Sequence, residues 1–543
     1  MSTHKQAMSD YLPERLPASL RRERVSVTDF GGLSRGMVTD AVNISPRHVP
    51  ALATRMPRGL FVSSFGSGTP HGMAFFDGYL FFARGTRLYR TEDGTSVVDL
   101  GAVSDTDKQF VVFGDRLYLY PDKLYVEKGG VMPTYVELDT GVIEQVDFAG
   151  SKITLPEGMG WTALGFRVGD GLRVVNADDV DPAPEGYYRI DEIHGREATV
   201  VGSFPSTCTC DALFRRTVPA LERVCVSGDR VYGVIGQDVY ISAAGSALDF
   251  YSKGASDGTN PVTLHTDTNG DFTACAAWQG YVVFFKSDRI CKLIGSRSDS
   301  FTLHDTPAVG IPARLADTLC EVNGALLYCA DGGVYRYCGQ EPERIAPAGA
   351  SAATDGCGGT DGYAYYLAVE QGTAGWRQYL YLPDTGDWYA EDDLHPTGMV
   401  RRDGFLCIQD SDGYIWLTSS DGRATGCSFV ERHVRGEVEA SVTLAPDYGF
   451  QPEGCRLTGI FIRATAQTGA TLEVLADYAD GQAGKDAVGT EAVSLASFEG
   501  KMTDRLLRIP VAPRLCDGVK LRFAMTGAWV IHAVIREYER AGQ

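Results

Sequence analysis

The chain has 543 residues, with 50 Lys and Arg against 70 Asp and Glu, which gives a formal net charge of −20 at pH 7. This charge argues against tight, sequence-independent binding to DNA phosphates, because that mode needs a surplus of basic side chains. The apolar content of 44% and the charged content of 22% exclude wholesale disorder, and at roughly 100–200 residues per domain the length predicts about two to four folded domains.

The first 24 residues lack the apolar core that defines a secretory signal. Their basic residues Arg21, Arg22 and Arg24 are typical of a flexible N-terminal arm, which we expect over residues 1–24. Nowhere does the chain approach the ~20 consecutive apolar residues of a membrane helix, so we expect no membrane insertion.

One sequence pattern recurs along the chain. A short polar turn, usually containing Gly, opens a run of aromatic and β-branched residues, and a second short run often ends in Tyr. Asp-Gly, Asn-Gly and Gly-Asp supply tight turns, and the flanking runs have strand propensity, so each copy predicts a β-hairpin. The seven copies open at 76–82, 114–120, 227–233, 279–285, 323–328, 361–367 and 403–408.

The spacing of these hairpins indicates the architecture. Gly280, Gly324, Gly362 and Gly404 follow one another at steps of 44, 38 and 42 residues. A period of ~40–50 residues with about four strands per unit is typical of β-propeller blades. We therefore predict an all-β protein with a β-propeller of about seven blades, formed by residues 25–146 and 204–429. A pair of β-sandwiches with similar turns is the alternative.

The step from Gly114 to Gly228 is far too long for one blade. Alternating residues at 166–174 and 187–193, followed by the short run 197–201, are typical of the strands of a small barrel. We therefore predict a small β-barrel over residues 147–203, inserted at a blade loop, where long insertions cost little.

After about residue 430 the hairpin signature stops, although alternation continues at 457–463, 519–523 and 529–535. A strand-and-turn pattern of this length predicts a separate domain. We expect a C-terminal β-sandwich over residues 430–543.

No local motif argues for catalysis, because the chain has no HExxH, Walker or Rossmann signature. Asp267, Asn269 and Asp271 alternate like the oxygen ligands of a calcium loop, but the rest of that motif is missing, and we interpret the segment as a plain turn. The run 410–413 is interpreted as an Asp-Gly turn between strands.

Three other features were weighed as candidate sites. The acidic run 391–393 follows the aromatic pair 388–389, and we interpret it as a solvated loop, with a cation or sugar contact as the alternative. His71 and His265 have no visible base–nucleophile partner in the sequence. Cys208 and Cys210 form a CxC pair, the closest pair among 13 cysteines.

The cysteine pattern indicates folding in a reducing cytoplasm without a disulfide framework, because the count is odd and the spacing irregular. Four cysteines inside apolar runs are interpreted as small hydrophobic residues: Cys225, Cys275, Cys329 and Cys407. The nine histidines are scattered, which argues against a zinc site. We therefore predict no catalytic residue, no cofactor and no metal, and a protein that is not an enzyme.

A series of phrases stands in a recognisable order along the predicted propeller: 30–33, 40–46, 50–59, 230–233, 240–250, 270–273, 283–286 and 331–337. Together they resemble the β-propeller virion proteins of tailed bacteriophages, and are similar to the tail-nozzle proteins of short-tailed phages. The resemblance covers about residues 29–390. The C-terminal sandwich matches the family only in its closing strand and Tyr538.

The resemblance implies a structural virion protein of the tail or neck, made and folded in the host bacterial cytoplasm. It implies a homo-oligomeric ring or conduit for DNA ejection, with portal or adaptor proteins and tail or fibre proteins as partners. Double-stranded DNA would be a passing cargo rather than a tight ligand, because an acidic wall lets the duplex slide.

Two other functions remain open at this point. A glycan-binding or glycan-cleaving propeller would need exposed Trp or Tyr platforms and, for cleavage, paired carboxylates. A bacterial scaffold propeller would bind protein partners only.

Overall fold

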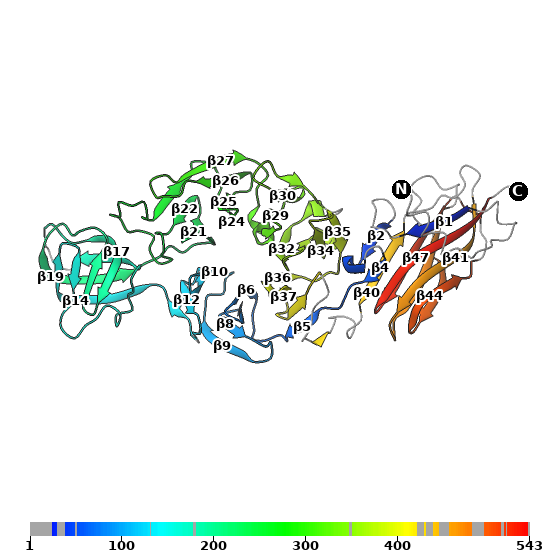
Figure 1. Ribbon diagram of the computed structural model, residues 1–543, viewed down its shortest axis with the longest axis horizontal. Helices are drawn as coiled ribbons and strands as arrows, with labels where there is room; N and C mark the ends of the chain where they lie inside the picture. The colour runs from blue at the N-terminus through cyan, green and yellow to red at the C-terminus, as the bar shows by residue number, and fades with distance from the viewer. Residues whose placement is uncertain are drawn as a thin grey trace.

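The computed structural model describes residues 24–29, 38–48, 51–130, 132–176, 181–346, 350–420, 428–429, 438–444, 455–479, 493–511, 515–516 and 518–540. These residues form three all-β parts in a row: a small barrel, a propeller and a sandwich (Figure 1). The propeller lies in the middle, with the barrel and the sandwich at opposite edges of it.

The propeller has seven blades within the described residues, each an antiparallel sheet whose strands run outward from the axis in chain order (Figure 1). Blade 1 contains β6 (Pro70–Phe76), β7 (Tyr79–Arg84), β8 (Arg87–Thr91) and β9 (Val97–Ala102), and blade 2 contains β10 (Gln109–Phe113), β11 (Arg116–Tyr120), β12 (Leu124–Glu127) and β13 (Thr134–Tyr135). Blade 3 contains β20 (Arg223–Ser227), β21 (Arg230–Ile235), β22 (Asp238–Ile241) and β23 (Val262–His265). Blade 4 contains β24 (Ala274–Trp278), β25 (Tyr281–Phe285), β26 (Arg289–Ile294) and β27 (Thr302–Pro307).

The last three blades follow without interruption. They are β28 (Cys320–Val322), β29 (Ala325–Ala330), β30 (Gly333–Tyr337) and β31 (Glu343–Arg344); β32 (Asp355–Thr360), β33 (Tyr365–Glu370), β34 (Trp376–Leu382) and β35 (Asp387–Ala390); and β36 (Pro396–Arg402), β37 (Phe405–Asp410) and β38 (Ile415–Thr418). Apolar side chains fill the space between neighbouring blades, as around Phe285, Tyr328 and Tyr365.

Each predicted hairpin joins the first two strands of one blade, so the predicted propeller is confirmed with seven blades. Between β28 and β29, for example, Asn323 and Gly324 have φ angles of 49° and 74°. Two successive positive φ angles make the tight turn whose twist matches antiparallel strands. These turns repeat because every blade needs the same reversal beside the axis.

The ring is closed by a strand from near the N-terminus. In blade 7, β5 (Gly59–Val62) pairs antiparallel with β38 and supplies the fourth strand, and β39 (Ser428–Phe429) pairs with its other edge. On the axial side, β36 of the last blade packs against β6 of the first. The first and last segments of the propeller are therefore held in one sheet.

The inserted barrel is a closed sheet in the order β14-β15-β18-β17-β16-β19. Its strands are β14 (Leu138–Ala149), β15 (Lys152–Thr154), β16 (Gly171–Asn176), β17 (Gly186–His194), β18 (Glu197–Val200) and β19 (Cys208–Arg216). Phe148, Trp161, Phe166 and Phe214 fill the interior and are fully buried.

The barrel strands span a wider segment than the predicted 147–203, beginning at Leu138 and ending at Arg216. The difference lies in β14 and β19, the first and last barrel strands in chain order. Most residues in the first half of β14 are exposed or half-buried, so its sequence lacks the apolar alternation that marks a barrel strand.

The C-terminal domain is a sandwich of two sheets around one apolar core. One sheet contains β3 (Ile44–Ser45), β4 (Leu52–Thr54), β47 (Trp529–Arg540), β41 (Cys455–Ala466) and β44 (Met502–Ile509), joined by β1 (Arg24–Asp29) and β45 (Leu515–Cys516). The other contains β2 (Val38–Val42), β40 (Glu439–Leu444), β46 (Gly518–Thr526), β42 (Thr471–Ala479) and β43 (Val493–Glu499). This second sheet is continuous with blade 6, because β2 pairs in parallel with β35.

The N-terminal strands β1 to β4 thus lie in the sandwich, although the sequence predicted that residues 25–146 belong to the propeller. Their partners, β40 and β47, lie hundreds of residues downstream, and no local pattern identifies them. The predicted arm falls almost wholly outside the described residues, which begin at Arg24. Within the described residues, no helix has the length and apolar character needed to cross a membrane.

Candidate functional site

The propeller encloses a cavity of about 700 Å³ on its axis. The innermost strand of each blade begins at one mouth of this cavity, so the residues at those strand starts form its rim. Residues of the rim that carry charge or an aromatic ring are His71, Asp107, Arg223, Asp317, Asp355, Trp376 and His395. A cavity of this volume is the size of a small-molecule site.

On one side of the rim, His71 of β6 is held between two carboxylates. Its Nε2 lies 2.8 Å from Asp105 Oδ1, and its Nδ1 lies 3.0 Å from Asp107 Oδ1. The imidazole is buried, whereas both carboxylates are exposed. Because both ring nitrogens are engaged, His71 has no nitrogen left to act as a base on a substrate in this arrangement. The sequence showed no partner for His71, and the structure provides two.

On the opposite side of the rim, Arg223 at the start of β20 forms an ion pair with Asp317, Nη1 to Oδ1 at 2.5 Å. Burial raises the pKa of Asp355, and the negative charges of Glu370 and Asp317 add to this effect. Nearby, the rings of Trp376 and His395 stack, with centroids 4.0 Å apart and an interplanar angle of 16°.

The thiols of Cys275, Cys320 and Cys357 line the axial cavity below the rim. Four successive innermost strands contribute one cysteine each: Cys225 on β20, Cys275 on β24, Cys320 on β28 and Cys357 on β32. A hydrogen bond with Cys275 and burial raise the pKa of Cys225, and burial raises the pKa of Cys320 to about 12. Such thiols are protonated at neutral pH and are therefore poor nucleophiles.

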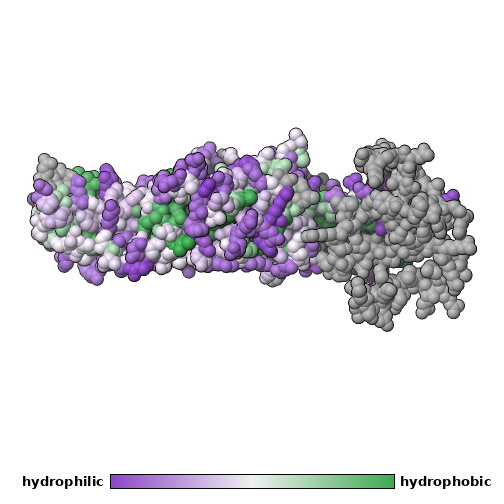
Figure 2. Space-filling model, turned by 90° about the horizontal axis from the view of Figure 1, so that it is seen from above, coloured by the Kyte–Doolittle hydropathy of each residue, from purple (hydrophilic) through white to green (hydrophobic). Residues whose placement is uncertain are grey.

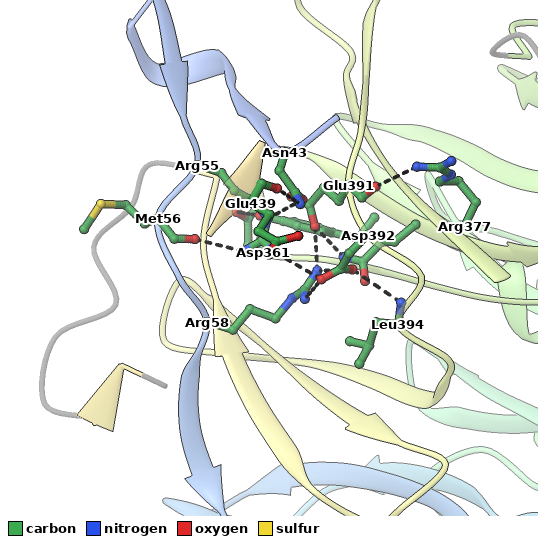
Figure 3. Close-up of polar contacts among 12 residues, drawn as sticks. Asn43, Arg55, Met56, Arg58, Asp361, Arg377, Glu391, Asp392, Leu394 and Glu439 are labelled. Atoms are coloured by element: carbon green, nitrogen blue, oxygen red, sulfur yellow. Dashed lines mark hydrogen bonds and ion pairs between the residues drawn. The ribbon is translucent and has the colours of Figure 1, made fainter. Parts of the chain in front are cut away.

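The acidic run at 391–393 belongs to a buried ion cluster where the sandwich meets blade 6 (Figure 3). Arg58 Nη1 and Nη2 donate to the two oxygens of Asp392 at 2.5 and 2.9 Å, and Nη2 also donates to Glu391 Oε2 at 2.9 Å. Arg55 Nη2 donates to Asp392 at 3.0 Å, and its Nε donates to Asn43 Oδ1 at 2.8 Å. We call these five residues the arginine clamp.

The arginine clamp overturns the interpretation of this acidic run as a solvated loop for Glu391 and Asp392, whereas Asp393 is exposed. Arg58 and Glu391 are 3% and 5% exposed. Burial alone would raise the pKa of Asp392, but Arg58 and Arg55 outweigh it and hold that pKa well below its usual range. These opposite charges neutralise one another. The clamp instead ties the segment between β4 and β5 to the segment after β35.

The segment that resembles a calcium loop contains its own cation. Lys286, the residue that follows β25, is fully buried. Its Nζ donates to Thr266 Oγ1 at 2.9 Å and to the backbone oxygen of Thr268 at 2.7 Å. The ammonium thus takes the loop oxygens that a calcium ion would need. Asp267 and Asp271 are exposed on the outside of the loop.

The remaining candidates are structural. Asp410 is buried and accepts hydrogen bonds from the backbone N–H groups of Asp412 and Tyr414, both at 3.0 Å, and from Trp416 Nε1 at 2.9 Å. These bonds close the turn predicted at 410–413. His265 pairs with Asp238 at 2.6 Å on the outermost strands of blade 3, away from the axis.

The CxC pair lies in the barrel. Cys208 and Cys210 both lie on β19, and Cys210 is buried in the barrel core. Within the described part of the chain, no group of three or more His, Cys, Asp or Glu side chains is placed to hold a metal ion.

No protein-family model and no curated protein matches the sequence. Among solved structures, BamB from Moraxella catarrhalis has 11% identity and a TM-score of 0.31, covering 73% of this chain and 98% of that chain. AztD from Citrobacter koseri has 12% identity and a TM-score of 0.30, covering 68% and 95%. Kluyveromyces lactis Hsv2 has 8% identity and a TM-score of 0.27, covering 59% and 96%.

These similarities are too low to carry a functional argument. The fold class rests on the strand order of the chain itself: seven radial sheets, closure by β5, the closed barrel and the two-layered sandwich.

Proposed function

We propose that this chain is a structural protein of a tailed-bacteriophage virion, of the nozzle or tail-hub type. In this proposal, copies assemble into a ring in the tail or neck, next to portal or adaptor proteins and tail or fibre proteins. The ordered sequence phrases at 29–390 suggest the family. The structural observation that supports it best is the row of three different β domains (Figure 1).

The barrel is fixed to the propeller rather than tethered to it. Arg216, at the end of the last barrel strand, donates from Nε to the backbone oxygen of Val136 at 2.6 Å and pairs with the buried Asp170 at 2.5 Å. On the blade 3 side, the rings of Tyr187 and Tyr251 pack with centroids 5.3 Å apart. A subunit of a ring must keep its domains in a fixed arrangement, and these contacts between the barrel and the propeller are consistent with that requirement.

The sandwich is fixed at the other edge by two independent means. The shared sheet joins β2 to β35, and the arginine clamp lies beside that junction. The two ends of the row therefore present unlike surfaces at a fixed spacing. A head-to-tail contact between unlike surfaces generates a closed ring when the rotation between copies closes.

The surface is mostly hydrophilic in the view of Figure 2, with small apolar areas. The barrel and the strand leading into it carry exposed apolar side chains, namely Met132, Tyr135, Val142 and Val168, which are 58–70% exposed. In this proposal, these side chains take part in the contacts between copies in the ring.

In this proposal, DNA passes through the opening of the ring and not through the propeller axis. The axial cavity of about 700 Å³ has the volume of a small-molecule pocket and cannot admit a duplex. A net charge of −20 suits a wall along which phosphates move without being held.

The test combines imaging with localisation. The full chain, purified, is examined by negative-stain electron microscopy and by light scattering after size exclusion, and tryptic peptides of the chain are sought in purified phage particles by mass spectrometry. We expect peptides in the particles, and rings either alone or with a portal or adaptor protein. Absence of the chain from particles that carry its gene would overturn the proposal.

A further inference from the structure

A second cavity, of about 860 Å³, lies between the sandwich and blade 6. One wall is the face of the sandwich sheet formed by β40, β46, β42 and β43. The other wall comes from the propeller, at the start of β34 and just after β35, and includes Trp376, Arg377 and Asp393. We call this cavity the interdomain groove. Domain boundaries of this kind are common places for ligand sites.

The sandwich wall of the interdomain groove, which we call its floor, leaves space because several of its side chains are small. Ser441 on β40 stands opposite Ala524 on β46, and Ser497 on β43 stands opposite Glu473 on β42. Thr471 stands opposite Thr526 in the next row. Larger residues at these cross-strand positions would fill the space between the domains.

Three charged side chains on this floor are uncommitted. Glu439, Glu473 and Arg522 line the groove and are exposed, and none of their side chains forms a hydrogen bond or ion pair with another described residue. The backbone oxygen of Glu439 accepts a hydrogen bond from Asn43 Nδ2 at 2.8 Å. The neighbouring charged side chains of the arginine clamp, by contrast, form ion pairs with one another. Among the residues that the structure describes, the groove therefore offers carboxylates and a guanidinium without a side-chain partner, with hydroxyl groups between them.

The chemistry of the lining selects a ligand class. Cationic and anionic groups are mixed along both walls, with Arg55, Arg377 and Arg522 among four acidic residues, so a strongly charged ligand of either sign would meet repulsion. Hydroxyl groups of a ligand can donate to the carboxylates and accept from Arg522. Trp376 adds an aromatic surface against which an apolar ring face can pack.

We propose that the interdomain groove binds a neutral oligosaccharide through Glu473 and Arg522, with Trp376 on the opposite wall. The groove borders the arginine clamp, because Asn43, Arg55 and Asp392 also line it, and it shares Trp376 with the lining of the axial cavity. It goes beyond the proposed structural role, because a virion component that also holds a glycan would contact the host surface.

The test uses the full-length chain on an array of neutral and acidic glycans, followed by calorimetry with the neutral glycans that bind. Glu473→Ala and Arg522→Ala are each expected to weaken binding about tenfold or more, because each removes hydrogen bonds to a charged group. Arg508→Ala is the matched control: this Arg is exposed on the other sheet of the sandwich and is expected to leave binding unchanged.

Thermal unfolding of all three variants checks that the sandwich remains folded. The proposal is overturned if no neutral glycan binds, if only acidic glycans bind, or if neutral glycans bind Glu473→Ala and Arg522→Ala as well as the unaltered chain. None of these results bears on the proposed structural role in the virion, which is tested by imaging and by the search for peptides in phage particles.

Discussion

Arg58 and Asp392 form a two-pronged ion pair across 334 positions of sequence, with Nη1 and Nη2 donating to separate carboxylate oxygens. The pair joins the segment that precedes the closing strand β5 to the loop that leaves blade 6. Substitutions at this pair therefore test both the closure of the propeller by β5 and the attachment of the sandwich to blade 6.

Arg58→Met is expected to destabilise the chain by about 3–5 kcal/mol, because it leaves Asp392 and Glu391 as buried charges without their main partner. Thermal or denaturant unfolding measures the effect. The control is Arg87→Met, whose ion pair with Asp99 lies on the surface and is expected to contribute less than about 1 kcal/mol. Equal effects of the two substitutions would contradict the role assigned to the clamp.

The clamp also predicts a pH dependence. The pKa of Asp392 is lower in the folded chain than in the unfolded chain, so its ionisation stabilises the fold above the unfolded value of about 3.9 and this contribution is lost as the pH falls through the folded value. Without Arg58, the buried carboxyl is easier to protonate. The melting temperatures of the unaltered chain and Arg58→Met are therefore expected to converge between pH 7 and about pH 3. A constant difference over this range would be incompatible with this prediction.

Ring closure can be tested at Leu60 in the middle of β5. This strand pairs on both sides, with β38 and β39, so Leu60→Pro removes a ladder hydrogen bond and is expected to cost about 3 kcal/mol or more. Val98→Pro in β9 is the control, because that strand pairs only with β8 within the described residues. Limited proteolysis should cut the Leu60→Pro propeller faster; similar resistance of both variants would argue against β5 as the closing strand.

Lys286 is expected to replace calcium rather than to compete with it. Lys286→Met removes the donor for Thr266 and Thr268 and should destabilise blade 4 by about 1–3 kcal/mol, whereas the exposed Lys501→Met should have little effect. Calcium should not raise the melting temperature of the unaltered chain. A calcium-dependent rise would show that the loop binds the ion after all.

Cys225 and Cys275 lie on adjacent innermost strands with their thiols in hydrogen-bond contact. At alkaline pH, where a larger share of these thiols is ionised, oxidised glutathione is expected to convert the pair to a disulfide, with two glutathione thiols released and a mass loss of about 2 Da in the chain. Cys225→Ser should abolish this change, and Cys291→Ser should not. If peptide mapping finds no bond between Cys225 and Cys275, the two sulfur atoms are not placed as inferred.

Local signals explain why the propeller was predictable. A turn such as Asn323-Gly324 specifies a hairpin by itself, and repetition of that signal reveals the blades and their number. The sandwich was predictable for the same reason, since alternation along β41 and β47 is visible in the sequence. Neither needs knowledge of which distant strand becomes the neighbour.

The clamp and the interdomain groove were not predictable because they depend on pairings between distant segments. The run 391–393 looks solvated in sequence, and only the approach of Arg55 and Arg58 from the N-terminal segment makes it buried. Lys286 is similar: an isolated Lys after an apolar strand gives no sign that its ammonium fills a loop 18–20 residues upstream. A run of small residues such as Ser441 also predicts nothing until the opposing wall is in place.

The closing strand imposes an order on synthesis. Because β5 ends at Val62 and β38 begins at Ile415, a ribosome must add 415 − 62 = 353 residues before the strand made early can meet its partner. At about 5–20 residues per second, that interval is roughly 20–70 s. During this time, six blades can form on the nascent chain while the edge of β5 stays without β38. A chaperone that shields this edge would act in that interval, and truncated nascent chains that stop before Ile415 should be the species that it binds.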